Sequence, residues 1–277
     1  MSNVQIIAIA NQKGGVAKTT SALALGTALA DRGQRVLLVD LDPQGSLTNA
    51  VGVPPHTLTT TLYTAMTAYL AERDTFTLDP YLHSLQPRRD LLPTNIGLAR
   101  AEVDLQHAVR REYVLAEMLA ATVTPHDVVL IDCPPSLSLL TINALTAATA
   151  VVIPVVPEYL AAYGLGLLME SIAEVRKSKL NATLQIAGVL LTMVDYRTLH
   201  GRETAEAVRA HLAGRAPLLG EIKRSIKAAE AAAHGLSITD YAAESDVALA
   251  YREVAAALLA SWDVDATPHP VEEATHA

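Results

Sequence analysis

Short apolar runs, many of them rich in β-branched residues, recur along the chain and are separated by longer segments with helical spacing of apolar positions. Apolar runs of this length, bounded by charged or turn-forming residues, are typical of buried strands. The pattern predicts strands at residues 4–10, 35–40, 128–131, 151–156 and 185–193, with a shorter one at 91–93.

The intervening segments are rich in Ala and Leu, which favour helices. We predict helices at residues 19–30, 98–121, 137–148, 161–178, 202–213 and 245–262. Strands that alternate with helices form a parallel sheet covered on both faces. The expected fold class is therefore α/β, a mostly parallel twisted sheet with helices on both faces.

The chain shows no repeat and no clear linker, so we expect one domain over residues 1–262. Residues 52–89 are weakly patterned and rich in Thr and Pro, which suggests a peripheral insertion of helix and loop. Residues 263–277 carry two prolines and several acidic residues and are expected to form a flexible tail.

Composition narrows the class of protein. A chain of 277 residues that is 51% hydrophobic can bury a large core. It contains no continuous apolar stretch long enough for a membrane span and lacks the features of a secretory signal, so we expect a cytoplasmic protein without a membrane anchor. Cys133 is the only cysteine, which excludes an internal disulfide. A net charge of −8 restricts any nucleic-acid contact to a local patch.

Residues 13–20 read Lys-Gly-Gly-Val-Ala-Lys-Thr-Thr and lie between a predicted strand and a predicted helix. A loop in this place directs backbone N–H groups at phosphate oxygens. Lys18 is placed to neutralise the β and γ phosphates of a nucleotide, and the Thr19 hydroxyl to ligate Mg²⁺. Gln12 and Ala17 stand where the standard P-loop pattern has glycines. We predict a P-loop NTPase-like fold that binds ATP and Mg²⁺, with the following nucleotide contacts in this loop: Lys13, Gly14, Gly15, Val16, Ala17, Lys18, Thr19 and Thr20.

Carboxylates follow two of the predicted strands. Asp40 and Asp42 end the second strand, and Asp132 ends the run at 128–131. Ligands bind at the carboxyl ends of strands in open α/β sheets, so these side chains are expected to face the phosphates. We predict that Asp42 positions the attacking water and contributes to the metal site together with Thr19 and Asp132. Asp40 and Asp132 are expected to act on the metal through water.

These motifs together resemble the ParA/Soj ATPases of DNA segregation, within the deviant Walker group that also includes MinD and the nitrogenase iron protein. The matching segments are residues 10–20, 36–45 and 132–137, with weaker matches at 143–145, 157–159 and 191–193. The resemblance implies that Lys13 reaches across a homodimer to the partner's phosphates. It also implies an adenine contact near Met193. Glu158 is either a ribose contact or a surface residue.

Members of this group use ATP hydrolysis to drive different cellular processes. The acidic, proline-broken tail argues against a MinD-like membrane helix, and a single cysteine argues against an iron–sulfur cluster. The resemblance implies ATP-dependent binding of non-specific double-stranded DNA, a ParB-like partner that stimulates weak ATPase activity, and a nucleoid-associated location. Positioning of a protein cargo, or spatial regulation of the MinD kind, is the alternative. The predicted DNA contacts are Arg197, Arg202, Lys223, Arg224 and Lys227, with a solvated surface balanced by Glu221 and Glu230 as the other interpretation.

Overall fold

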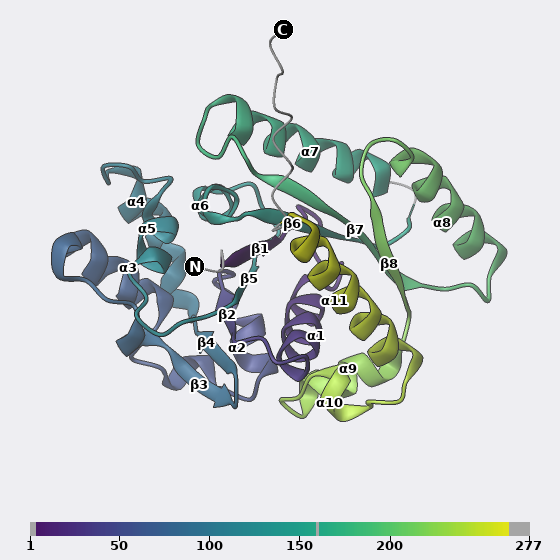
Figure 1. Cartoon of the computed structure of the whole chain (residues 1–277), viewed down its shortest axis with the longest axis horizontal. Helices are drawn as coiled ribbons and strands as arrows, with labels where there is room; N and C mark the ends of the chain where they lie inside the picture. Colours follow the sequence, from purple (N-terminus) through teal and green to yellow (C-terminus); the bar gives the residue numbers. More distant parts are fainter. Residues whose placement is uncertain (1–3, 159–160, 266–277) are drawn as a thin grey trace, which may run out of the picture.

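A computed structural model of the chain describes residues 4–158 and 161–265. Its strands form a single sheet in the order β3-β4-β2-β5-β1-β6-β7-β8 (Figure 1). All neighbouring strands are parallel except β3 and β4, which are antiparallel. The strands are β1 (Gln5–Ile9), β2 (Val36–Asp40), β3 (His83–Gln86), β4 (Arg89–Leu92), β5 (Val128–Asp132), β6 (Ala150–Val155), β7 (Gln185–Val194) and β8 (Leu218–Lys223).

Helices follow most of the strands, as the sequence pattern predicts. They are α1 (Lys18–Asp31), α2 (Ser46–Ala50), α3 (Leu62–Ala71), α4 (Ala101–Gln106), α5 (Val114–Ala120), α6 (Leu139–Ala147), α7 (Ala161–Lys177), α8 (Leu199–Leu212), α9 (Ile226–Ala233), α10 (Ile238–Tyr241) and α11 (Asp246–Asp265). Short 3₁₀ turns occupy Pro55–Thr57, Arg73–Thr75, Asp79–Tyr81 and Ile96–Arg100.

Side chains that alternate along the strands feed two separate hydrophobic clusters, one on each face of the sheet. Ala8 of β1 packs in the cluster formed with helices α3 to α8, whereas Ile7 and Ile9 pack in the cluster formed with α1, α2 and α9 to α11. Gly26 lets α1 approach the sheet closely, since a Cβ there would lie 2.7 Å from a methyl carbon of Leu38. The predicted α/β class with helices on both faces is confirmed (Figure 1).

The continuous helix predicted for residues 98–121 is wrong. A 3₁₀ turn leads into α4, and residues 107–113 separate α4 from α5. Arg110 adopts φ 56°, a left-handed conformation that an α-helix cannot continue through. Buried Asn143 of α6 compensates for the break, because it accepts a hydrogen bond from the Leu115 backbone N–H and donates one to the Arg111 carbonyl.

The segment at 52–89 is more integral to the fold than predicted. Leu62, Met66 and Leu78 are fully buried in the core, and β3 forms an edge strand of the sheet. Strand β8 was not predicted from the sequence. It forms the opposite edge of the sheet and has no continuous run of buried residues. Helix α11 extends to Asp265, three residues beyond the predicted end, and the rest of the predicted tail lies outside the described residues.

None of the described helices combines the length and the apolar composition that a membrane span requires.

Candidate active site

The connection from β1 to α1 forms a tight loop around an open space. Gly15 has φ 70°, and nothing lies within 4 Å of the place where a Cβ of Gly14 or Gly15 would stand. Ala17 also has a left-handed φ of 62°, which costs an L-residue about 1 to 2 kcal/mol. This conformation explains why a glycine suits the position in the standard pattern. The alanine keeps the loop shape at a cost in strain.

Two polar side chains outside the phosphate-loop motif fix this loop to the neighbouring strands. Asn11 donates to the Pro154 carbonyl of β6 at 2.7 Å and accepts from the Lys13 backbone N–H at 2.9 Å. Thr192 of β7 donates its hydroxyl to the Val16 carbonyl at 3.1 Å. Both side chains are buried. Neither role could be predicted from the sequence, because the bonds to the Pro154 and Val16 carbonyls join segments more than 140 residues apart.

Lys18 is the buried cation of the loop. Its side chain lies at the start of α1, and its ammonium group donates to the Lys13 carbonyl at 3.2 Å. Burial lowers the pKa of Lys18, while Asp132, Cys133 and Asp42 act in the opposite direction. A polyphosphate at this loop would supply the strong counter-charge that a buried ammonium group requires.

Thr19 and Asp132 meet at the carboxyl end of β5. The Thr19 hydroxyl donates to Oδ2 of Asp132 at 2.7 Å, while Oδ1 of Asp132 is buried without a hydrogen-bond partner among the described residues. Burial, reinforced by the nearby Asp40 carboxyl, raises the pKa of Asp132 well above its ordinary value. An unsatisfied carboxylate oxygen beside a threonine hydroxyl fits a hydrated Mg²⁺, which takes oxygen ligands and retains several waters.

Asp40 and Asp42 have different surroundings although they are two residues apart. Asp42 lines the open space at the loop, and its Oδ1 accepts from the Gln44 backbone N–H at 3.0 Å. Asp40 is fully buried, and its Oδ2 accepts from both the backbone N–H and the hydroxyl of Thr48, at 2.7 and 2.6 Å. Asp40 therefore fastens the end of β2 to α2. These bonds hold the segment that carries Asp42, and a water-mediated role of Asp40 at the metal stays a prediction.

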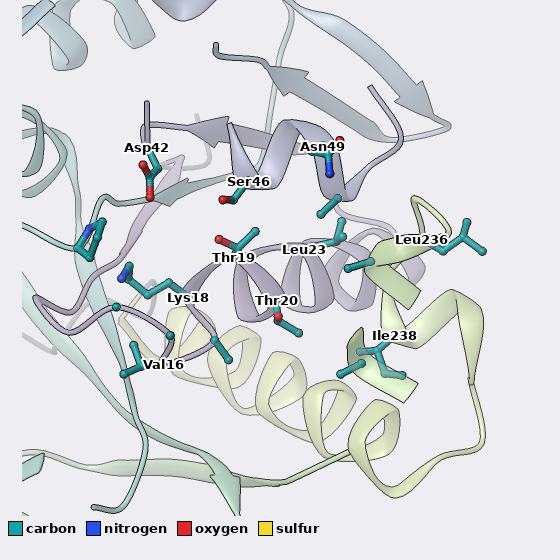
Figure 2. A pocket seen from close by; sticks show the side chains of 17 residues that line it. Val16, Lys18, Thr19, Thr20, Leu23, Asp42, Ser46, Asn49, Leu236 and Ile238 are labelled. Carbon is teal, nitrogen blue, oxygen red and sulfur yellow. The ribbon is translucent and has the colours of Figure 1, made fainter. Parts of the chain in front are cut away.

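The loop opens onto a cavity of about 430 Å³. Asp42 and Ser46 project into it from one side, opposite Lys18 and Thr19 (Figure 2). The lining residues are Gly14, Gly15, Val16, Ala17, Lys18, Thr19, Thr20, Leu23, Asp42, Ser46, Asn49, Ala50, Pro135, Ala228, Ala232, Leu236 and Ile238. All of the predicted loop contacts except Lys13 are among them, and Asp42 joins them.

A second cavity of about 290 Å³ shares Ala17, Thr20, Ala228 and Ala232 with the first. Its walls are mostly apolar and include Met193, as a site for a purine base would require. The remaining lining residues are Thr192, Ile222, Lys223, Arg224, Ser225, Ala229, Val247 and Tyr251. The two cavities together offer one compartment for phosphates and an adjoining one for a base.

Lys13 lies outside the lining of both cavities. Its ammonium group forms an exposed ion pair with Glu158, beyond the end of β6. The Lys13 backbone is held by Asn11, but its side chain is free to exchange one anionic partner for another, because an exposed ion pair contributes only about 0 to 1 kcal/mol.

The predicted DNA contacts gather around two neighbouring strand ends. Arg197 pairs with Asp195 after β7, and Lys223 pairs with Asp246 at 2.8 Å. Arg224 and Lys227 have exposed side chains. Lys227 lies in the first turn of α9, whereas Arg224 precedes that helix, which begins at Ile226.

Comparison with known proteins agrees with this geometry. A family model described as an AAA domain matches residues 4–186. The chromosome partitioning protein ParA of Caulobacter vibrioides is 41% identical over 254 residues, covering 91% of this chain and 92% of that protein. The chain belongs to the ParA/Soj family of deviant Walker ATPases. A second relative, the chromosome-partitioning ATPase Soj of Thermus thermophilus, is 40% identical over 259 residues, covering 94% of this chain and 97% of that protein.

A solved structure that this chain resembles contains bound ligands. The structure described as cobyrinic acid a,c-diamide synthase from Mycobacterium smegmatis, with bound ADP and magnesium, superposes with a TM-score of 0.81 at 38% identity. The match covers 95% of this chain and 97% of that chain. Homologues of this chain thus bind adenine nucleotides together with magnesium.

Proposed function

We propose that this chain is an ATP-hydrolysing dimer switch that binds non-specific double-stranded DNA in its ATP state and drives chromosome or plasmid partitioning. One observation supports a coupling between ATP binding and DNA binding. Lys223, Arg224 and Ser225 line the cavity proposed for the base, and the same segment contributes to the basic surface. A nucleotide in that cavity therefore stabilises the segment that presents cations to DNA.

The hydrolytic roles follow from the loop geometry. Lys18 neutralises the β and γ phosphates, Thr19 and Asp132 hold Mg²⁺, directly and through water respectively, and Asp42 orients the attacking water. The bound Mg²⁺ supplies charge neutralisation at the transferring phosphate. Met193 and its apolar neighbours receive the adenine.

The dimer is proposed from the position of Lys13. Its cation lies at the surface beside the phosphate loop, where only Glu158 neutralises it among the described residues. In a face-to-face dimer this lysine reaches the partner's phosphates and stabilises the charge of the transition state, as an arginine finger does. ATP then holds the two subunits together.

The relatives' names support partitioning as the process that ATP hydrolysis drives. A ParB-like protein is the proposed stimulator of slow hydrolysis, and the nucleoid is the proposed location in the cytoplasm.

Duplex-DNA binding measured with ATP and Mg²⁺, with ADP and without nucleotide, across a salt series, tests this proposal. We expect tight binding only with ATP, weakening steeply as salt rises because counterions are released. The Lys18→Ala variant is the matched control and should bind no better with ATP than without. Absent binding, or binding that ignores both nucleotide and salt, would refute a DNA switch and favour positioning of a protein cargo.

A further inference from the structure

Two neighbouring connections carry the same three-residue pattern. Arg197-Thr198-Leu199 follows β7, and Arg224-Ser225-Ile226 follows β8. In each, an arginine precedes a hydroxyl-bearing N-cap and an aliphatic residue begins the helix. The strands are adjacent and parallel, and the Arg224 backbone N–H donates to the Val194 carbonyl at 3.0 Å. The two patterns therefore lie side by side at one edge of the sheet.

Both aliphatic side chains face solvent. Leu199 is 64% exposed and Ile226 is 78% exposed. Neither contributes to the anchoring of its helix, because α8 is buried through Ala205, Val208 and Leu212, and α9 through Ala231. The exposed side chains of Leu199 and Ile226 are therefore available to contact a partner.

Cationic residues lie close in sequence to the two aliphatic residues. Arg202 and Lys227 lie in the first turns of α8 and α9, close in sequence to Leu199 and Ile226. Arg224 and Lys227 have no ion-pair partner in the part of the chain that the structure describes. The surface thus combines positive charge with isolated apolar contacts, which fits an anionic partner that also offers apolar surface.

Duplex DNA meets both requirements, since sugars and base edges lie between its phosphates. A lipid bilayer fits less well. Surface helices that bind bilayers present a long apolar face, whereas α8 turns its apolar face to the core.

We propose that Leu199 and Ile226 pack into a groove of the duplex against sugars and base edges, while the flanking cations contact phosphates. This inference rests on the proposed DNA-binding function. It adds an apolar contribution to the affinity for DNA, which salt does not screen. The cations set the salt dependence, and the two aliphatic residues set an affinity offset that is the same at every salt concentration.

The test compares Leu199→Ser, Ile226→Ser and the double variant with Arg224→Ala, using a mixed-sequence duplex, ATP and Mg²⁺ across a salt series. Each serine variant should weaken binding about 3- to 10-fold, from partial loss of aliphatic burial, with an unchanged slope of log affinity against log salt. Arg224→Ala should reduce the slope by about one. Val123→Ser is the matched control, because Val123 is 79% exposed and precedes the amino end of β5, whereas Leu199 and Ile226 follow the carboxyl ends of β7 and β8.

Wild-type affinity in the double variant would overturn the inference, as would a changed slope in the serine variants. So would an effect confined to vesicles of equal parts phosphatidylcholine and phosphatidylglycerol, with DNA binding intact. If the wild type itself binds no DNA with ATP, the proposed function fails, and the inference fails with it. That result is distinct from a wild type that binds DNA with no contribution from Leu199 and Ile226.

Discussion

Replacement of Asp40 by asparagine tests the charge balance behind the phosphate loop. Burial raises the pKa of the Asp40 carboxyl from 3.8 to about 7, although hydrogen bonds from Thr48 oppose the rise. Because the folded-state pKa exceeds the unfolded one, folding favours the protonated form. The stability contributed by this group is complete below pH 4 and is lost as the pH rises toward 7.

The structure sets the size of this effect. A pKa difference of about three corresponds to about 4 kcal/mol, and roughly 2 to 3 kcal/mol of that is lost between pH 5 and pH 8. Asparagine has no charge to lose and retains an oxygen that can accept both bonds from Thr48. The variant should therefore lose this part of the pH dependence. Removing the Asp40 charge also makes ionisation of Asp132 easier, which further flattens the profile.

The assay is urea unfolding of the nucleotide-free protein at pH 5 and pH 8. The wild type should lose about 2 to 3 kcal/mol more than Asp40→Asn over this interval. Asp74→Asn, at an exposed side chain, is the control and should follow the wild type. An Asp40→Asn profile parallel to that of the wild type would refute the buried-carboxyl reasoning.

Three further predictions concern the loop. Lys18→Ala should abolish ATP binding in calorimetry, since it removes the buried cation; unimpaired affinity would reject the phosphate-loop assignment. Thr192→Val leaves the Val16 carbonyl without its buried partner and should lower the free energy of unfolding in urea by about 1 to 3 kcal/mol, whereas Thr192→Ser should be as stable as the wild type. A Thr192→Val variant as stable as the wild type would contradict a stabilising bond from Thr192 to the loop. Thr19→Val should raise the Mg²⁺ concentration needed for ATP hydrolysis, and an unshifted Mg²⁺ titration would exclude Thr19 as a ligand.

Strands β1, β2 and β5 could be predicted from sequence because they are buried on both faces and read as continuous apolar runs. Their carboxyl ends carry the loop, Asp42 and Asp132, so most of the site followed from the same pattern. Strand β8 could not be predicted, because an edge strand is only partly buried.

The contacts that position the site were hidden from sequence for a different reason. Asn11 and Thr192 act on the loop through strands distant in the chain. The sequence places both Asp40 and Asp42 at the carboxyl end of β2 and does not show which of them is buried. Only the packing of α2 separates a buried carboxyl bonded to Thr48 from one that faces the cavity.

The most direct test of the ATP-driven dimer mixes two inactive variants. Lys13→Ala removes the cation proposed to act on the partner's phosphates, and Asp42→Ala removes the carboxylate proposed to orient water within its own subunit. In a mixed dimer one of the two sites retains both groups. Equal mixing at random should restore about one quarter of the wild-type ATPase rate, although each variant alone is inactive. A mixture as inactive as its components would contradict a lysine that acts across the dimer.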